Sequence, residues 1–229
     1  MKTRRALIAL IACWLLVAGC GVNKSIYVAD GETVEGGKAT VNGKVTIGSN
    51  CQVRGDCRTV NGRVTVGSGS EVGGLQTVNG SIRIANNVTV DGDVGTVNGS
   101  IRLAENTSVG GEVETVNGSI DCGSGGKIAA DISTVNGSIH IVRTEVGGSL
   151  TTVNGSVTLT DKSRVVEDIV IKGKNRRGAK KKPLEITIAD GSIVEGNIIV
   201  RDPKRQVKVI LTGGGKVKGE VENAEVVEE

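Results

Sequence analysis

Apolar residues in this chain alternate with polar ones in short runs that recur at a regular spacing. In the segment 77–95, the pairs Ile82/Ile84 and Val88/Val90 each flank one polar residue, and Val78 and Val94 complete the apolar set. A period of two indicates strands with one buried face. The turn-forming residues between the pairs are Asn79-Gly80, Ala85-Asn86-Asn87 and Asp91-Gly92-Asp93. The pattern therefore predicts three short strands and three corners, with all six apolar side chains buried and no room for a helix.

The tetrapeptide Thr-Val-Asn-Gly marks each repeat of this pattern. Its seven copies are 18 or 19 residues apart and begin at Thr40, Thr59, Thr77, Thr96, Thr115, Thr134 and Thr152. One unit could not fold alone, because burying six aliphatic side chains gains roughly 9–18 kcal/mol and ordering its backbone costs ~1–2 kcal/mol per residue. Stacked units share one core. We expect an all-β fold: a right-handed, three-faced, single-stranded β-helix (β-solenoid) of about ten coils of 18–19 residues.

Stacking would bring the asparagines of the repeat into one column. At a coil spacing of ~4.8 Å, each side chain could bond to its neighbours as an amide ladder. The predicted members are Asn42, Asn61, Asn79, Asn98, Asn117, Asn136 and Asn154. We expect the glycine after each asparagine to supply a positive φ. A motif present in every coil favours a structural role for this corner, and a ligand groove along the ladder is the alternative.

The repeat decays after Val170, although its logic persists. The segments 186–196 and 207–221 still match parts of a coil, whereas Lys172–Pro183 is typical of a loop inserted at the Asn-Gly corner. The tail from Glu220 to Glu229 is acidic, and we expect it to form a solvated end cap that discourages association through strand edges.

The first twenty residues have the pattern of a targeting segment. Three cations precede an apolar run over residues 6–17, which is short for a membrane span. The sequence Leu16-Val17-Ala18-Gly19-Cys20 resembles the lipobox of bacterial lipoproteins. This resemblance implies that Cys20 is acylated and becomes the N-terminus after cleavage, and Gly21 in place of Asp implies the outer membrane. A simple cleaved signal with an incidental cysteine is the alternative.

These features divide the chain into three expected segments. Residues 1–19 would be the signal peptide, 20–32 the lipidated terminus and tether, and 33–229 the solenoid with its inserted loop and acidic cap. The formal net charge is +3, and the three leader cations account for it. The mature protein would therefore be close to neutral.

Against that neutral background, the inserted loop carries a concentrated positive charge. Its cations are Lys172, Lys174, Arg176, Arg177, Lys180, Lys181 and Lys182. Such a cluster attracts polyanions, so lipopolysaccharide or another anionic envelope polymer is the expected partner, and a solvated loop without a partner is the alternative. Nucleic acid is not expected, because the envelope is the wrong compartment and Tyr27 is the only Phe, Trp or Tyr of the expected mature chain, which leaves no set of aromatic residues on which bases could stack.

Few residues suggest catalysis or metal binding. The repeat places Cys51, Cys57 and Cys122 at inward positions. The envelope permits a Cys51–Cys57 disulfide, although packing as buried thiols is the favoured interpretation. His140, the one histidine, falls at an outward position in a column with Arg83, Arg102 and Asp121. No Cys-x-x-Cys motif or histidine cluster accompanies these residues, and we expect no catalytic residue, metal or cofactor.

The repeat resembles two groups of bacterial β-solenoids. One is a widespread adhesin-like family of unknown function with Val-Asn-Gly corners, matched here by Thr-Val-Asn-Gly-Ser-Ile at residues 77, 96, 115 and 134. The other is the bactofilins, which are polymer-forming cytoskeletal proteins. These resemblances imply a structural or interaction (adhesin-like) protein, with self-assembly into a polymer as the alternative; the lipobox departs from typical cytosolic bactofilins. Polysaccharide-acting β-helix enzymes are a weaker alternative, because the corners are short and aromatic residues for sugar stacking are missing.

Overall fold

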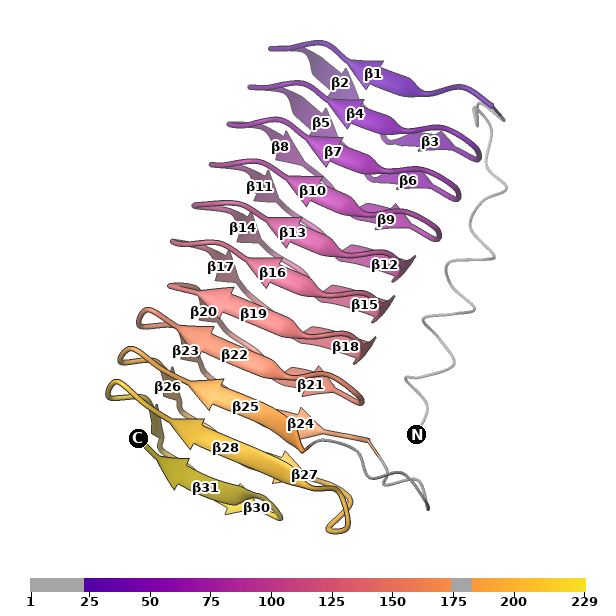
Figure 1. The fold of residues 1–229 in the computed structure, drawn as a ribbon. Coiled ribbons are helices and arrows are strands. Elements are labelled where there is room, and N and C mark those ends of the chain that lie inside the picture. The colour runs from indigo at the N-terminus through magenta and orange to yellow at the C-terminus, as the bar shows by residue number, and fades with distance from the viewer. Residues whose placement is uncertain (1–22, 174–182) are drawn as a thin grey trace.

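The computed structural model describes residues 23–173 and 183–229, and all regular elements within these ranges are β-strands. The chain winds as a β-solenoid in which each coil gives one strand to each of three parallel sheets (Figure 1). The sheets hold 11, 10 and 10 strands. The prediction of an all-β, three-faced solenoid of about ten coils is confirmed.

The three sheets are numbered in the order in which the chain enters them. Sheet 1 consists of β1 (Ile26–Val28), β4 (Val45–Ile47), β7 (Val64–Val66), β10 (Ile82–Ile84), β13 (Ile101–Leu103), β16 (Ile120–Cys122), β19 (Ile139–Val142), β22 (Val157–Thr160), β25 (Leu184–Ile188), β28 (Val207–Leu211) and β31 (Glu225–Glu228). Sheet 2 consists of β2 (Thr33–Glu35), β5 (Gln52–Arg54), β8 (Glu71–Val72), β11 (Thr89–Val90), β14 (Ser108–Val109), β17 (Lys127–Ile128), β20 (Glu145–Val146), β23 (Arg164–Val165), β26 (Ile193–Val194) and β29 (Lys216–Val217). Sheet 3 consists of β3 (Lys38–Thr40), β6 (Cys57–Thr59), β9 (Leu75–Thr77), β12 (Val94–Asn98), β15 (Val113–Asn117), β18 (Ile132–Asn136), β21 (Leu150–Thr152), β24 (Ile169–Ile171), β27 (Ile198–Val200) and β30 (Val221–Glu222).

Three corners connect these sheets. Corner 1 leads from sheet 1 to sheet 2, corner 2 from sheet 2 to sheet 3, and corner 3 from sheet 3 to sheet 1 of the next coil. Corner 3 is the Asn-Gly corner of the repeat. In Figure 1 the coils run from β1 at the indigo end to β31 at the yellow end.

Equivalent residues of successive coils lie in register, which builds the core as continuous columns. Ile82 pairs with Ile101, and Ile101 with Ile120. All three side chains are fully buried. Because each strand is hydrogen-bonded to the coils on both sides, a single coil is stabilised by its neighbours rather than by a core of its own.

One position of the repeat faces the opposite way from our expectation. Val78 is only partly buried, whereas Thr77 is fully buried. The cause is the alternation of β9, in which Leu75 and Thr77 point inward and the next residue must point outward. The threonine of Thr-Val-Asn-Gly, rather than its valine, therefore belongs to the interior.

The solenoid also begins earlier than the sequence suggested. Strand β1 pairs with β4, joining Ile26 to Val45 and Val28 to Ile47, so residues 26–28, which were expected in the tether, belong to the solenoid, while residues 20–22 lie outside the described residues. The segment Asn23-Lys24-Ser25-Ile26 is a variant of Asn-Gly-Ser-Ile with lysine in place of glycine. That substitution hid the first coil.

The end of the chain is likewise part of the solenoid. Strand β31 (Glu225–Glu228) pairs with β28 and is the last strand of sheet 1. The acidic tail is thus built into the final coil instead of being appended to it. The inserted loop lies at corner 3, between Ile171 of β24 and Leu184 of β25. Of its seven cations, Lys172 is described, and the other six lie outside the described residues.

Candidate functional site

The asparagines of corner 3 form one continuous ladder. Each Nδ2 donates to the Oδ1 of the asparagine one coil earlier, at distances of 2.8–3.0 Å. The members are Asn23, Asn42, Asn61, Asn79, Asn98, Asn117, Asn136 and Asn154, that is, the seven predicted residues and Asn23 before them. Because each amide is occupied by its neighbours, the ladder supports a structural role more than a ligand groove.

The buried threonines fasten the same corner from inside. The Oγ1 of Thr115 donates to the carbonyl oxygen of Gly99 at 2.9 Å, and Thr96 does the same to Gly80 at 2.8 Å. The same contact recurs from Thr40 to Thr134. Thr152 is the exception, since its buried Oγ1 has no partner.

The glycines of corner 3 have a different purpose from the one we expected. None of them, from Gly43 to Gly155, has a positive φ. A Cβ on Gly118 would instead overlap the carbonyl oxygen of Gly99 in the coil above. Glycine is therefore required for close approach between coils. Most left-handed residues lie at corner 1, where Asn87 and Asn106 have φ of 57° and 54°; the exceptions among the described residues are Gly36 at corner 2 and Asn223 at corner 3.

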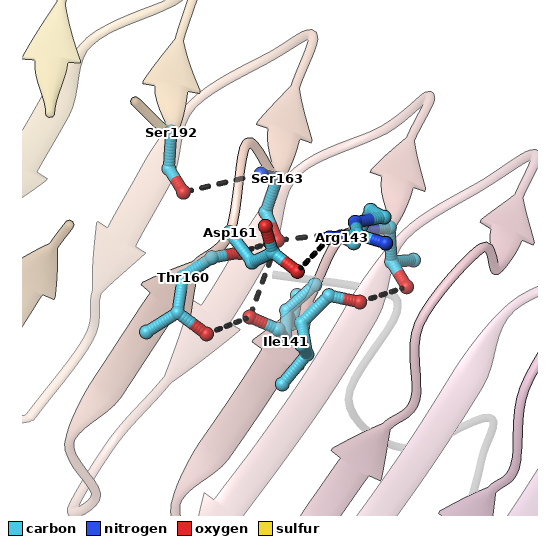
Figure 2. Close-up of polar contacts among 8 residues, drawn as sticks. Ile141, Arg143, Thr160, Asp161, Ser163 and Ser192 are labelled. Atoms are coloured by element: carbon cyan, nitrogen blue, oxygen red, sulfur yellow. Dashed lines mark hydrogen bonds and ion pairs between the residues drawn. The ribbon is translucent and has the colours of Figure 1, made fainter. Parts of the chain in front are cut away.

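Corner 1 contains a second buried polar column, which sequence reasoning missed. Its hydroxyls, all at most 2% exposed, belong to Ser70, Thr107, Thr144, Ser163 and Ser192. Figure 2 shows the best connected one: Ser163 Oγ donates to the carbonyls of Thr160 (2.6 Å) and Ile141 (3.2 Å) and its amide donates to Ser192 Oγ (3.1 Å). Since Cys51 and Val88 fill this position in other coils, the signal was available in the repeat alignment. The partners are backbone atoms, which indicates a structural column.

The three cysteines within the described residues, Cys51, Cys57 and Cys122, are free thiols, so the disulfide considered for Cys51 and Cys57 is not formed. Cys51 lies at corner 1 and its Sγ donates to the carbonyl of Ala29 at 3.0 Å, whereas Cys57 begins β6 in sheet 3. Burial raises the pKa of the Cys57 thiol to about 11 and that of Cys122 to about 12. Both thiols are protonated at neutral pH and therefore poor nucleophiles.

The outward column of sheet 1 contains the charged residues expected there. Arg102 lies 3.5 Å from Asp121, and Asp121 pairs in register with His140. An exposed pair at this distance contributes little to stability. Within residues 23–173 and 183–229, no group of three or more His, Cys, Asp or Glu side chains could hold a metal ion.

Sheet 3 carries an acidic group that sequence reasoning did not single out. Burial, followed by the neighbouring carboxylate of Glu112, raises the pKa of Glu114 to about 7. Ser133 Oγ donates to Glu114 at 3.4 Å. The Glu114 carboxyl is consequently about half protonated near neutral pH.

Both ends of the described solenoid place a charged residue in a column that is otherwise apolar. Lys38 of β3 is in register with Cys57, which is followed in the column by Leu75. Glu228 of β31 is in register with Leu211. Inward charges at a sheet edge oppose further strand addition. These two residues are thus built-in obstacles to stacking.

A hollow lies at corner 3 in the last coils. Its volume is about 580 Å³. The lining consists of Pro183, Pro203, Lys204, Arg205, Gln206, Val207, Asn223, Ala224 and Glu225. Arg205 is one of these lining residues, and its Nε is buried without a hydrogen-bond partner. In this part of the molecule, a cavity and an unsatisfied cationic group coincide.

No protein-family model, curated protein or solved structure matches this chain. In the described ranges there is also no helix of the length and apolarity that a membrane crossing needs.

Proposed function

We propose that the protein is a lipid-anchored component of the bacterial envelope, acylated at Cys20, whose solenoid is a rigid structural or interaction module without catalytic activity. The leader resembles a lipobox, and Gly21 after the cysteine favours the outer membrane. The proposed partner of the module is an anionic envelope polymer such as lipopolysaccharide, attracted by the cations of the inserted loop.

The observation that carries this proposal is the position of the first coil. Asn42 Nδ2 already donates to Asn23 Oδ1 at 2.8 Å, and Asn23 follows Cys20 by three residues. Three residues span at most about 10 Å. An acyl chain on Cys20 would therefore hold the first coil close to the bilayer surface, and the register-locked stack of about ten coils would extend about 48 Å from it.

Replacing Cys20 with serine tests the anchor. We expect the Cys20→Ser variant to lose acylation and to move from the membrane fraction to the soluble fraction or to remain unprocessed, because a hydroxyl does not accept the thioether-linked lipid. Intact-mass measurement and detergent phase partitioning read out both effects. Cys13→Ser, in the apolar run of the leader, is the matched control and should remain acylated; equal behaviour of the two variants would refute the anchor.

A polymer is the second candidate function, and one observation favours it. Val226 is 44% exposed although it is in register with the fully buried Val209, so the last coil leaves core surface uncovered. Copies stacked end to end would cover it. Glu228 opposes that arrangement, because stacking would bury its charge.

We therefore expect the wild-type chain to stay monomeric and Glu228→Val to associate. Removing the inward charge leaves Val226 beside a new apolar residue on an unpaired strand edge. Light scattering coupled to size exclusion should show a mass that rises with concentration for this variant. Glu222→Val removes the same charge at an outward position of the same coil and should remain monomeric. A wild-type mass that already rises with concentration would favour the polymer.

A further inference from the structure

Corner 3 is enlarged in two successive coils. Four residues separate β21 from β22, whereas 12 separate β24 from β25 and six separate β27 from β28. The sheet 1 register nevertheless continues, with Val157 paired to Ile186 and Ile186 to Val209. In repeat proteins, insertions that leave the stack intact map to loops on one face, which is often the binding face.

Both enlargements contribute to the hollow at corner 3. Pro183 comes from the end of the first and Pro203 to Gln206 from the second, while Asn223 and Ala224 come from the turn before β31 and Glu225 begins that strand. The volume of about 580 Å³ is in the range of small-ligand sites. The second enlargement is held by its own turn, in which Arg205 N donates to the carbonyl of Asp202 at 2.9 Å and Lys204 N to its Oδ1 at 3.1 Å.

The electrostatics of the hollow favour an anion. Arg205 lines the hollow, and an arginine guanidinium can donate two parallel hydrogen bonds to a ligand carboxylate or phosphate. Lys204 adds a second positive charge to the lining. Glu225 is a carboxylate in the lining, and its neighbour in register is Lys208.

The remaining lining groups suit a sugar. Asn223 Nδ2 donates to the carbonyl of Val200 at 3.0 Å, which fixes the amide. Gln206 brings a second side-chain amide, and amides both donate to and accept from hydroxyls. Pro183 and Pro203 offer apolar ring surfaces for the C–H groups of a sugar ring.

We propose that this hollow binds an acidic sugar unit, a uronic acid or a sugar phosphate, of an anionic glycan, with Arg205 pairing with the acidic group. The proposal deepens the proposed function, on which it depends for the supply of such glycans in the envelope. It assigns recognition of the glycan to a defined hollow rather than to the cations of the inserted loop.

Saturation-transfer NMR on the detergent-solubilised full chain tests the site. The probes are glucuronic acid and glucose 6-phosphate, with glucose as the neutral comparison. We expect both acidic probes to bind and Arg205→Gln to weaken them roughly tenfold or more, as for the loss of a bidentate ion pair. Arg201→Gln removes the same charge from the same corner outside the lining and should change binding less than twofold.

A second variant keeps the test decisive if Arg205→Gln folds poorly. Glu225→Gln removes a negative charge that would repel the acidic group of either probe. This variant should bind both acidic probes more tightly and leave glucose binding unchanged. Equal weakening by Arg205→Gln and Arg201→Gln, or equal binding of glucose and glucuronic acid, would overturn the proposal. Binding here is measured away from any membrane, so its failure is distinct from failure of the anchor, which the Cys20→Ser fractionation reports.

Discussion

Gly118→Ala is expected to lower the free energy of unfolding by more than about 4 kcal/mol. The added Cβ would overlap the carbonyl oxygen of Gly99 and lie 2.5 Å from its carbonyl carbon. Both are backbone atoms locked by the neighbouring coils, so relief requires separating two coils and breaking ladder hydrogen bonds on both sides. Thermal and urea unfolding followed by circular dichroism should show a large fall in both midpoints.

Gly95→Ala is the matched control for this substitution. Gly95 lies one coil above in sheet 3, and a Cβ built there meets nothing within 4 Å. Alanine also removes the entropic cost of glycine in a strand, so this variant should be unchanged or more stable by about 0.5–1 kcal/mol. If the two alanine variants unfolded at the same midpoint, the close approach of coils at corner 3 would not be what requires glycine.

Thr115→Val is expected to destabilise the protein by roughly 1–3 kcal/mol. Valine keeps the shape of the side chain but removes the hydroxyl that donates to the Gly99 carbonyl at 2.9 Å. That carbonyl would lose its partner in the interior of the stack. Unfolding midpoints measured as for the glycine variants provide the readout.

Thr152→Val makes the same chemical change where the hydroxyl is unpartnered. The Thr152 side chain is fully buried and its Oγ1 has no hydrogen bond. Removing a buried unsatisfied group should therefore stabilise the protein by about 1 kcal/mol. Opposite signs for the two valine variants are expected; the same sign would mean that packing, and not the hydroxyl contact, governs this position.

The repeat predicted the fold well because its 18- or 19-residue period and its two-residue alternation indicate the same arrangement of stacked strands. Side-chain alternation alone identifies Ile82 and Ile84 as buried, and the 18- or 19-residue spacing implies the vertical register that the structure has. The Asn ladder followed from that register. The error at Val78 arose because hydrophobicity was given priority over alternation. In a strand that ends on a buried threonine, alternation decides the orientation.

The hollow could not be predicted in the same way. Its lining comes from residues where the repeat has broken down, and the pocket depends on how two enlarged turns lie against each other. Arg205 has no counterpart in the regular coils. Sequence reasoning instead selected the inserted loop by counting its charges. A charge count indicates an electrostatic field, but it does not reveal a cavity. The free thiols show the same limit, since sharing a coil does not place Cys51 and Cys57 in bonding geometry.

Lys24 restricts how the solenoid could be lengthened by duplication of its coils. The next seven coils have glycine at this place, from Gly43 to Gly155, because the coil above leaves no space, and a Cβ on Gly43 itself would meet the carbonyl of Lys24. In a regular corner of this kind, a lysine would place its Cβ against the carbonyl of a coil stacked above it. If the coil with Lys24 were duplicated and placed below another coil, the lysine would lie against the carbonyl of that coil, so lengthening by repeat duplication is expected to copy coils that have glycine at this place.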